Sequence, residues 1–347
     1  MAVAVVALDL SRSGLRGVQV EAAYTDRPKL TRFAAIPVPE GAIFDGEFVD
    51  VNRGAAAIKE LWKVGGFTTK KAVLGLSNRK VVVREVTLPA MTGPRRKAAL
   101  RFAVEGQVPI DLDDAILDFL PLRIAEGTRE PAHEGLLVAT ARSSLEGTAS
   151  AIERAGRQLD AVDFAGFGLL RVLLGRTPGT HAIINIGSSS TTVIIAADGR
   201  PAFARILPSG GDDITRAIER ALGVDFIEAE EDKVARGLQG GATTSRDVEA
   251  ETVLRENVAS LIDSIRNTLN FYGNAHPRQP VESLTLTGGG SRLKGLGPVL
   301  ARALGIPTLL GDPLGAFQVA RGVAEAGLAQ WTLEMAAPIG VAMGAKR

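Results

Sequence analysis

Short apolar runs alternate along this chain with longer segments in which apolar residues recur every three or four positions. Runs of four to eight residues rich in Val, Ile and Ala predict buried strands, and the longer spacing predicts amphipathic helices. The first part of the chain predicts strands over 3–10, 14–21, 30–37 and 71–77 and a helix over 52–63. This alternation predicts an α/β protein whose sheets are covered by helices.

Between positions 81 and 161 the pattern changes. It predicts a strand over 81–88, a helix over 95–107, strands over 116–124 and 136–141, and a helix over 144–156. That order predicts a small α+β unit inserted into the larger domain.

After position 163 the opening pattern returns, with strands predicted over 181–186 and 191–197 and a turn between them. The same hairpin therefore occurs twice, roughly 175 residues apart, which indicates a duplicated domain. A late strand over 283–287 runs directly into three glycines. Helices are predicted over 212–222, 229–237, 248–273, 296–304 and 316–328.

Composition narrows the classes of function. Lys and Arg number 40 against 39 Asp and Glu, so the net charge of +1 argues against a broad nucleic-acid-binding surface. The 347 residues predict more than one domain. The chain has no Cys, which excludes disulfides, zinc-thiolate sites and a cysteine nucleophile. Its apolar first residues lack a basic leader and contain Asp9, so they predict a strand rather than a signal peptide.

Three Gly- and Ser-rich turns each follow a predicted buried strand, at 9–14, 185–191 and 286–291. Small side chains expose consecutive backbone N–H groups, and with neighbouring hydroxyls these form a concavity suited to phosphate oxygens. A single turn of this kind is typical of any tight turn. Two turns in duplicated positions and a third before a helix together favour nucleotide binding.

With these turns the chain resembles the actin/Hsp70/hexokinase superfamily, and within it the FtsA/PilM family of actin-like proteins. Further segments carry the likeness to PilM of type IV pilus assembly. They are 102–119, where a helix leads through Pro and an acidic turn into a strand, the Pro-Ser-Gly-Gly-Asp-Asp-Ile-Thr run at 208–215, the Ala-Glu-Glu-Asp-Lys run at 229–233, and 262–272. The segment 337–345 matches the family's end only loosely.

The resemblance implies an actin-like (ribonuclease H-like) duplicated two-domain α/β fold with an inserted small α+β subdomain. On this basis residues 1–80 form the first half of domain 1 and 81–161 form the subdomain. Residues 162–325 form domain 2 with its nucleotide-binding loops, and 326–347 return to domain 1.

The resemblance also implies an ATP site between the two domains. Asp9 would face the phosphates through a hydrated Mg²⁺, since a bare carboxylate would repel them, and Arg12 would be the only nearby cation. Glu230 and Lys233 would hold the ribose and the base edge. Two alternatives stay open: Asp9 capping its own turn, and Glu230 with Lys233 as a solvated ion pair. The full implied set is Asp9, Ser11, Arg12, Ser13, Asn185, Gly187, Ser188, Ser189, Ser190, Thr191, Gly210, Gly211, Glu230, Lys233, Gly288, Gly289, Gly290 and Arg292.

Two departures from the family pattern concern the rate of ATP hydrolysis. Ser11 stands where the first turn usually has Gly, and Asn185 stands where the second hairpin usually begins with Asp. Asn keeps its hydrogen bonds but cannot act as a base. We therefore expect nucleotide binding with slow or absent hydrolysis. No residue is assigned a catalytic role.

The resemblance further implies that the subdomain docks the N-terminal peptide of PilN, an inner-membrane protein. The chain would then be a cytoplasmic scaffold recruited to the membrane by its partner, beside other pilus components, and weak self-association stays open. Rival hypotheses are a small-molecule kinase of the same superfamily and an FtsA-like polymerising protein. Candidate groove residues are Val82, Leu88, Phe102, Val104 and Leu120, for which the subdomain's own core is the alternative.

Overall fold

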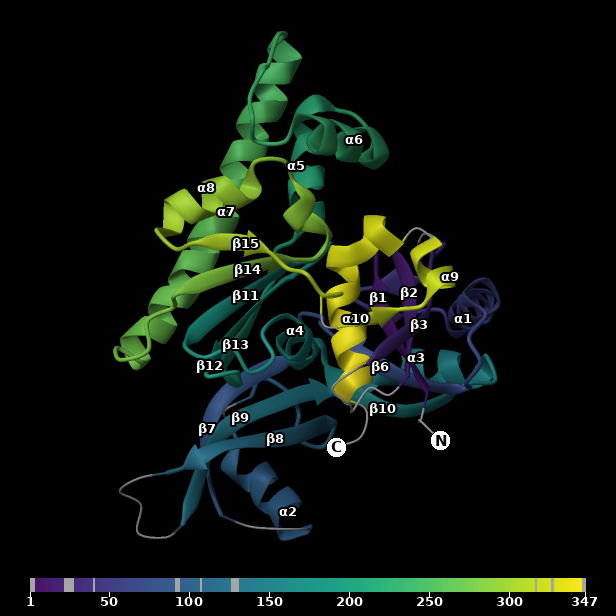
Figure 1. Cartoon of the computed structure of the whole chain (residues 1–347), viewed down its shortest axis with the longest axis vertical. Coiled ribbons are helices and arrows are strands. Elements are labelled where there is room, and N and C mark those ends of the chain that lie inside the picture. Colours follow the sequence, from purple (N-terminus) through teal and green to yellow (C-terminus); the bar gives the residue numbers. More distant parts are fainter. Residues whose placement is uncertain are drawn as a thin grey trace.

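The chain forms two lobes that lie side by side, and a small third unit lies below them (Figure 1). The structure, a computed structural model, describes residues 4–21, 28–39, 41–90, 94–106, 108–125, 131–315, 317–325 and 328–344. Predicted ends at positions 3, 107, 316 and 345 lie outside these residues.

The first lobe contains a six-stranded sheet in the order β10-β6-β1-β2-β3-β16. Strands β1, β2 and β3 form an antiparallel meander, and β6 and β10 continue the sheet in parallel with β1. Helices α1 and α3 pack against each other at this lobe. The elements are β1 Val5–Ser11, β2 Gly14–Glu21, β3 Lys29–Ile36, β4 Ile43–Phe44, β5 Glu47–Phe48, α1 Val51–Gly65, β6 Lys71–Leu76, α3 Ser143–Arg154, β10 Gln158–Phe164 and β16 Gln318–Val319.

The second lobe repeats this plan. Its sheet has the order β13-β12-β11-β14-β15, again an antiparallel meander followed by two parallel strands. The same order in both lobes agrees with the duplication that the two hairpins predicted. The elements are β11 Thr180–Ile186, β12 Thr191–Ala197, β13 Arg200–Leu207, α5 Gly211–Leu222, α6 Phe226–Arg236, α7 Ser245–Ala275, β14 Ser283–Thr287, the 3-10 helix η1 Gly289–Arg292, α8 Leu296–Leu304 and β15 Thr308–Leu310.

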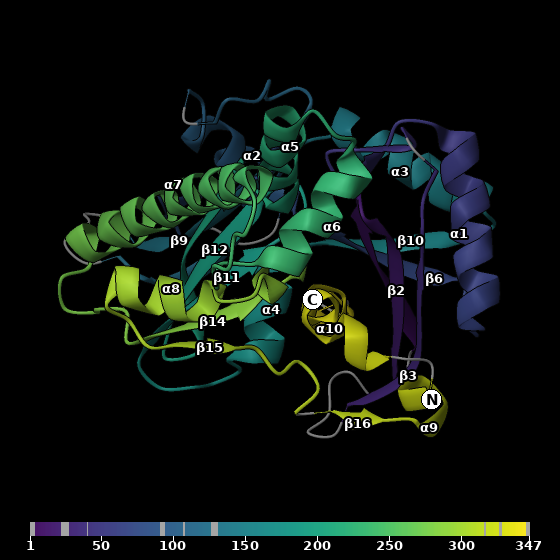
Figure 2. The ribbon, with the colours of Figure 1, turned by 90° about the horizontal axis from the view of Figure 1, so that it is seen from above.

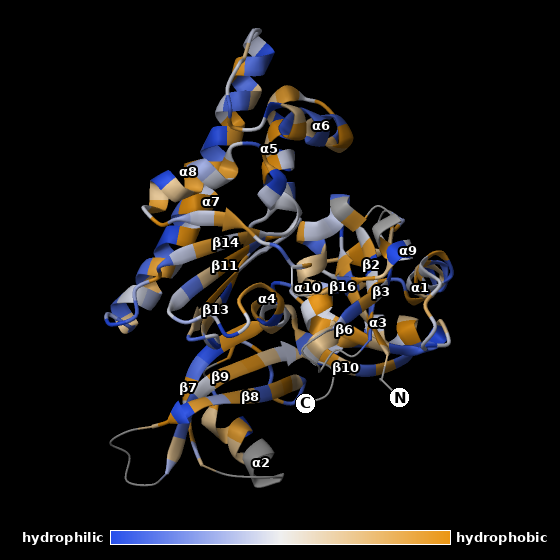
Figure 3. Cartoon of the chain, in the orientation of Figure 1, coloured by the Kyte–Doolittle hydropathy of each residue, from blue (hydrophilic) through white to orange (hydrophobic). Residues whose placement is uncertain are grey.

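Two large hydrophobic cores stabilise the lobes. Strands β11 and β14 carry hydrophobic positions among more polar ones, and the long helix α7 carries many hydrophilic positions (Figure 3). Side chains of Ile184, Leu254 and Leu286 are fully buried in one core of the second lobe. The other core is shared between the lobes: it holds the first-lobe sheet and also takes in Ile183, Ile194 and Ala204 on the face of the second-lobe sheet that α4 covers.

Helices α4 (Ala165–Leu173) and α10 (Thr332–Gly344) cross between the two lobes (Figure 2). The crossing is close because both helices present glycine there. A Cβ on Gly168 would lie 2.8 Å from the nitrogen of Val341, and a Cβ on Gly340 would lie well inside van der Waals contact with the carbonyl of Gly168. These glycines allow the two backbones to touch.

The small unit is a three-stranded antiparallel sheet, ordered β7-β9-β8, covered by α2. It has its own core, which includes Leu88, Val104 and Phe119. The helix predicted over 144–156 was assigned to this unit, but Leu145 and Ile152 of α3 lie in the core of the first lobe. Strand β10 likewise joins the first-lobe sheet. The elements of the unit are β7 Val82–Pro89, α2 Pro94–Ala103, β8 Ala115–Ile124 and β9 Ala132–Ala141.

The segment predicted as a helix over 316–328 differs from the prediction. Gln318 and Val319 form β16, which pairs in parallel with β3, and only α9 (Arg321–Glu325) and the 3-10 helix η2 (Leu328–Trp331) follow. The chain has therefore returned to the first lobe by position 318, earlier than the predicted boundary at 326. Strands β10 and β13 and helices α4 and α10 were not predicted as defined elements. None of the described helices is long and apolar enough to cross a membrane.

Candidate functional site

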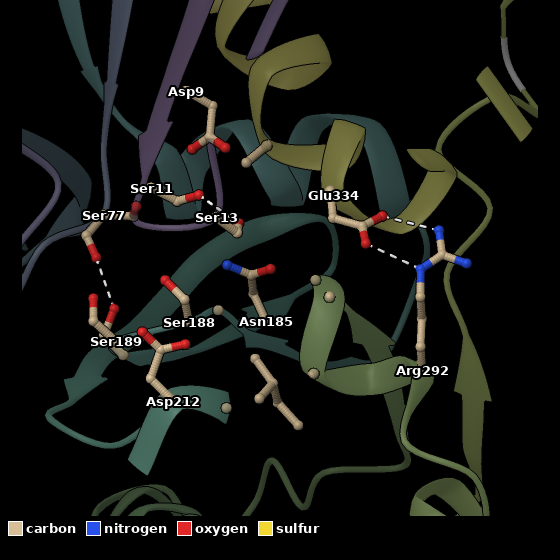
Figure 4. Close-up of a pocket in the computed structure, with 18 of the residues that line it drawn as sticks. Asp9, Ser11, Ser13, Ser77, Asn185, Ser188, Ser189, Asp212, Arg292 and Glu334 are labelled. Carbon is tan, nitrogen blue, oxygen red and sulfur yellow. Dashed lines mark hydrogen bonds and ion pairs between the residues drawn. The ribbon is translucent and has the colours of Figure 1, made fainter. Parts of the chain in front are cut away.

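The three Gly- and Ser-rich turns line one cavity of about 370 Å³ between the lobes. Figure 4 shows Ser11 and Ser13 of the first turn facing Asn185 and Ser188 of the second. The third turn, at 288–290, closes the side of the second lobe. Fifteen of the eighteen residues proposed from the sequence line this cavity, so the fold brings together segments that are far apart along the chain.

The first turn joins β1 to β2 and places two hydroxyls at the cavity. Ser11 Oγ and Ser13 Oγ lie 2.8 Å apart. Gly14 permits the tight turn, since its φ is +142° and a Cβ there would lie 2.6 Å from the carbonyl oxygen of Ile36. Asp9 lies at the end of the same strand and also lines the cavity.

Arg16 on β2 is a cation of this site that the sequence interpretation missed. Its Nη1 donates to Asp9 Oδ2 at 3.0 Å and to Ser11 Oγ at 3.0 Å, and its Nη2 donates to Ser13 Oγ at 2.7 Å. The residue is only 4% exposed, and its guanidinium lies 5.3 Å from the ring centre of Trp331. An arginine inside the apolar run of a buried strand was the signal that could have revealed it.

Arg12 therefore is not the only nearby cation, and that prediction was wrong. Arg12 does not line the cavity; its Nη1 lies 3.4 Å from Asp212 Oδ2 and its guanidinium lies over the ring of Phe226. The main chain turns between Ser11 and Ser13, which sends the intervening side chain outward toward the second lobe. Lys233 provides a further cation at the cavity wall.

The second turn joins β11 to β12. Gly187 N donates to the carbonyl of Ser190 at 2.9 Å, and Ser190 Oγ reaches across to the carbonyl of Ser77 in the first lobe at 3.1 Å. Thr191 is fully buried and donates to the carbonyl of Ser209, so it supports the turn without lining the cavity. Ser188 and Ser189 remain at the cavity wall.

Helix α5 begins against this turn. Gly211 N donates to the carbonyl of Gly187 at 2.9 Å, and Asp212 N donates to the carbonyl of Ser188 at 2.8 Å. A Cβ on Gly210 would lie inside van der Waals contact with that same Ser188 carbonyl, which explains the glycine there. Gly210 thus packs behind the turn, and Gly211 lines the cavity.

Lys233 on α6 is buried against α5, and its ion pair with Glu230 is only partly solvated, since the Glu230 side chain is 41% exposed. Lys233 is 8% exposed, and its Nζ donates to Gly211 O at 3.1 Å, Thr215 Oγ1 at 2.8 Å and Glu230 Oε2 at 2.6 Å. Thr215 also donates to the same Glu230 oxygen. The ammonium protons of Lys233 are therefore all engaged, and the lysine fixes the carboxylate of Glu230 at the cavity edge.

The third turn follows β14. Gly288 has φ +82°, and a Cβ there would lie 2.5 Å from the carbonyl oxygen of Ile186, while a Cβ on Gly290 would collide with the Ile186 side chain. The close approach of β11 explains these two glycines. Apolar side chains complete the wall beside Gly288, Gly289 and Gly290, namely Ile214, Val234, Val258, Leu261, Leu293 and Leu296.

Arg292, a member of the implied nucleotide-binding set, is held toward α10. Its Nε and Nη2 donate to the two oxygens of Glu334 at 3.0 and 2.9 Å, and Nη2 also donates to the carbonyl of Gln330 at 2.5 Å. The hydrogen bond to Glu334 raises the pKa of the Arg292 guanidinium. This fork-to-carboxylate pair ties the third turn to the helix between the lobes (Figure 4).

The charges around the cavity are mixed. Four carboxylates, those of Asp9, Asp212, Glu230 and Glu334, line it together with the cations of Arg16, Lys233 and Arg292. Burial raises the pKa of Asp212, against the opposing effect of Arg12 and Lys233.

A metal ion here would have few protein ligands. In the part of the chain that the structure describes, no three His, Asp or Glu side chains are grouped to hold a metal ion. A cation beside Asp9 would therefore take most of its ligands from water and from the oxygens of a bound phosphate, which suits Mg²⁺.

The five predicted groove residues do not share one surface. Leu88 and Val104 are 3% and 0% exposed and belong to the subdomain core, and Val82 packs partly against it. Phe102 on α2 is 80% exposed. Leu120 follows the core residue Phe119 on β8, so it faces the other side of the sheet.

Comparison with known proteins relates this geometry to a family. A family model described as type IV pilus assembly protein PilM matches residues 7–346. The cell division protein FtsA of Bacillus subtilis is 23% identical over 224 residues, which cover 58% of this chain and 51% of FtsA. The chain spans about half the length of the curated relatives that it matches.

Solved structures agree on the fold. A PilM-PilN type IV pilus biogenesis complex is similar with a TM-score of 0.86 and 25% identity, covering 100% of both chains. MreB5 of Spiroplasma citri bound to AMPPNP is similar with a TM-score of 0.51 and 13% identity, covering 94% of this chain and 95% of that one, and this likeness shows the fold alone. The predicted actin-like fold and the resemblance to the PilM family are both confirmed.

Proposed function

The chain belongs to the PilM family of type IV pilus assembly proteins, and on that premise we propose that it is a nucleotide-binding cytoplasmic scaffold. It would bind Mg-ATP between its lobes and dock the N-terminal cytoplasmic segment of a PilN-like inner-membrane protein. Recruitment to the cytoplasmic face of the inner membrane would follow from that partner. Other pilus components would assemble around the pair.

One observation carries the nucleotide proposal: the turns at 9–14, 185–191 and 286–291 meet at one cavity. Backbone N–H groups and hydroxyls from two facing hairpins suit a chain of phosphates. The apolar wall beside the third turn suits a purine, and the fixed carboxylate of Glu230 suits ribose hydroxyls.

Each charged residue has a defined part in this proposal. Arg16 neutralises Asp9 and offers its guanidinium to phosphate oxygens, while Asp9 holds the hydration shell of a magnesium ion that shields the phosphates. Arg292 and Glu334 hold the third turn in place against α10. Asn185 lies between the hairpins as an amide, so it binds without accepting a proton.

We propose that hydrolysis is slow or absent, because Asn185 replaces the carboxylate that would serve as a base at the second hairpin. A phosphate-release assay at saturating Mg-ATP should give a rate near that of buffer alone. Asn185→Asp restores a carboxylate at this position and should raise the rate by about tenfold or more. Rapid release by the unchanged protein would contradict this part of the proposal.

Calorimetric titration with Mg-ATP tests nucleotide binding. We expect saturable binding with one site, and a loss of about tenfold or more in affinity for Asp9→Asn. The matched control Asp263→Asn removes the same charge from the exposed surface of α7 and should bind as the unchanged protein does. Chelating Mg²⁺ should lower the ATP affinity of the unchanged protein and leave the ATP affinity of Asp9→Asn nearly unchanged.

Two results would reject the nucleotide proposal: no heat of binding at millimolar Mg-ATP, or equal affinities for Asp9→Asn and the unchanged protein. If Asp263→Asn lowered the ATP affinity as much as Asp9→Asn does, net charge and not the cavity would control binding.

The docking proposal rests on family membership and on the similar PilM-PilN complex. Phe102 indicates where on the subdomain the peptide would dock. Its aromatic side chain on α2 is 80% exposed and offers apolar area to a peptide. Leu88 and Val104 would act only indirectly, by holding the subdomain together.

Fluorescence anisotropy with a labelled N-terminal peptide of the PilN-like protein tests docking. Phe102→Asp should weaken binding by about tenfold or more, because the charge cannot be buried under an apolar peptide. Ile227→Asp is a matched control, since Ile227 is 71% exposed on α6 of the second lobe. Equal binding by both variants would contradict docking at α2.

A further inference from the structure

Arg12 and Asp212 form an ion pair between the two lobes at the edge of the cavity, and we call this edge its mouth. None of the proposed nucleotide roles explains this pair. Arg12 lies in the first-lobe turn and Asp212 opens helix α5 of the second lobe. Arg12 Nη1 lies 3.4 Å from Asp212 Oδ2, and the guanidinium lies 4.5 Å from the ring centre of Phe226 on α6. One side chain thus links the first lobe to two helices of the second.

The ion pair between Arg12 and Asp212 is only weakly stabilised. Asp212 Oδ2 is buried, yet among the described residues it accepts no hydrogen bond, so the contact with Arg12 is purely an ion pair. Burial raises the pKa of the Asp212 carboxyl, which means that its charged form is poorly compensated. Arg12 keeps 40% of its side chain exposed and its guanidinium donors free for another anion.

The pair also lies where a chain of phosphates would end. Asp212 lines the cavity next to Ser188, and Arg12, which lies in sequence between the lining residues Ser11 and Ser13, meets Asp212 from the first lobe without lining the cavity itself. Figure 4 shows Asp212 below the space between these hydroxyls. A terminal phosphate held by both hairpins would meet the carboxylate of Asp212, which repels it, and the guanidinium of Arg12, which attracts it.

We propose that Arg12 is the specificity-determining residue for a third phosphate, and that Asp212 is its competing partner. Without nucleotide, Asp212 and Phe226 of the second lobe hold the side chain of Arg12, and this contact keeps the two lobes together at the mouth of the cavity. A nucleoside triphosphate takes the guanidinium from Asp212, whereas a diphosphate is too short to do so and leaves the pair intact. This inference rests on the proposed nucleotide site and adds a means of distinguishing the two nucleotides.

Calorimetry with Mg-ATP and Mg-ADP tests the selectivity. Arg12→Ala should lower the affinity for ATP by about tenfold and change that for ADP by less than about twofold. Asp212→Asn should raise the affinity for ATP by about fivefold relative to ADP, since it removes the repulsion and frees Arg12. Arg101→Ala, which breaks an exposed pair with Asp113 in the subdomain, is the control and should change neither affinity.

A second measurement addresses the closed mouth without any nucleotide. Because the chain has no Cys, Lys59→Cys on α1 and Glu231→Cys on α6 can be spin-labelled selectively. The distance distribution between the labels should be narrow in the empty protein and broaden with Arg12→Ala. Mg-ATP should shift it, and Mg-ADP should leave it as in the empty protein.

Equal losses of ATP and ADP affinity in Arg12→Ala, or an unchanged distance distribution in that variant, would overturn the inference. Failure of the unchanged protein to bind any nucleotide would instead reject the proposed function and, with it, the sensing of phosphate. The label distances would then still decide whether Arg12 closes the mouth.

Discussion

At the scale of single residues, Arg16 holds the first turn together. It is buried, and its guanidinium bonds to Asp9, Ser11 and Ser13 at once. A buried charge of this kind is stable only because its partner is charged and close. The arrangement prepares the turn for an anion before any ligand arrives.

Arg16→Ala should therefore destabilise the protein strongly, by about 3 kcal/mol, because it leaves Asp9 as an uncompensated carboxylate. The double variant Asp9→Ala with Arg16→Ala should recover part of that loss, since it removes both charges. Chemical denaturation of the two single variants and the double variant measures the coupling. Strictly additive losses would show that the two side chains do not depend on each other.

Glu47 provides a prediction on pH. Burial raises the pKa of this carboxyl above its ordinary value of 4.5, although the hydrogen bond from Lys80 opposes the rise. The folded protein then binds this proton more tightly than the unfolded chain does. The contribution of protonated Glu47 to the free energy of unfolding is fully present below the ordinary pKa. It is lost as the pH rises through the pKa of Glu47 in the folded protein.

Glu47→Gln removes this titration and keeps an oxygen for the hydrogen bond from Asn78. The stability of the variant relative to the unchanged protein should increase between about pH 4 and pH 7. Thermal denaturation of both proteins across that range checks the direction. A relative stability that falls with rising pH would contradict the assigned cause.

At the scale of elements, the crossing of α4 and α10 connects the lobes through Gly168 and Gly340. A Cβ on Gly340 would meet the Gly168 carbonyl well inside van der Waals contact, and this neighbour is backbone that cannot move aside easily. The packing therefore depends on the absence of a side chain at this position.

Gly340→Ala should destabilise the protein by about 2 kcal/mol or more through overpacking. Gly273→Ala is the matched control: Gly273 lies within α7, and a Cβ there meets nothing within 4 Å. That control should stabilise by about 0.5 to 1 kcal/mol, because alanine favours a helix. Similar effects of the two substitutions in denaturation would contradict the close crossing.

How far the sequence predicts these elements depends on where their partners lie. The two hairpins and the strand before Gly288 were predicted because continuous apolar runs ended in turn residues. Strand β10 alternates exposed and partly buried residues and leads into α4 without a break, so periodicity alone gave no boundary. Helix α10 is buried almost throughout and contains Pro338, which removes the usual amphipathic signal.

The same limit applies to the site. Strand-ending turns predicted Asp9, Ser188 and Gly288 at the cavity, because their backbone chemistry is local. The direction of a side chain is set by contacts distant in sequence, and so Arg12, expected at the phosphates, instead lies against Asp212 outside the cavity. Arg16 was missed although its contact is local, since the register of the first hairpin places it directly opposite Asp9.

At the scale of the whole molecule, the lobes are joined at both ends of the cavity. Helices α4 and α10 cross at one end, and the contacts Arg12–Asp212 and Ser190–Ser77 bridge the lobes near the hairpins. A ligand that fills the cavity would touch both lobes and would stabilise one relation between them.

A crystal structure of the protein grown with Mg-ATP tests the central claim most directly. The account predicts phosphate density between the turn of Ser11 and Ser13 and the turn of Ser188 and Ser189, with the base against Gly288–Gly290 and the apolar wall. A nucleotide bound outside this cavity, or an empty cavity at saturating Mg-ATP, would contradict it.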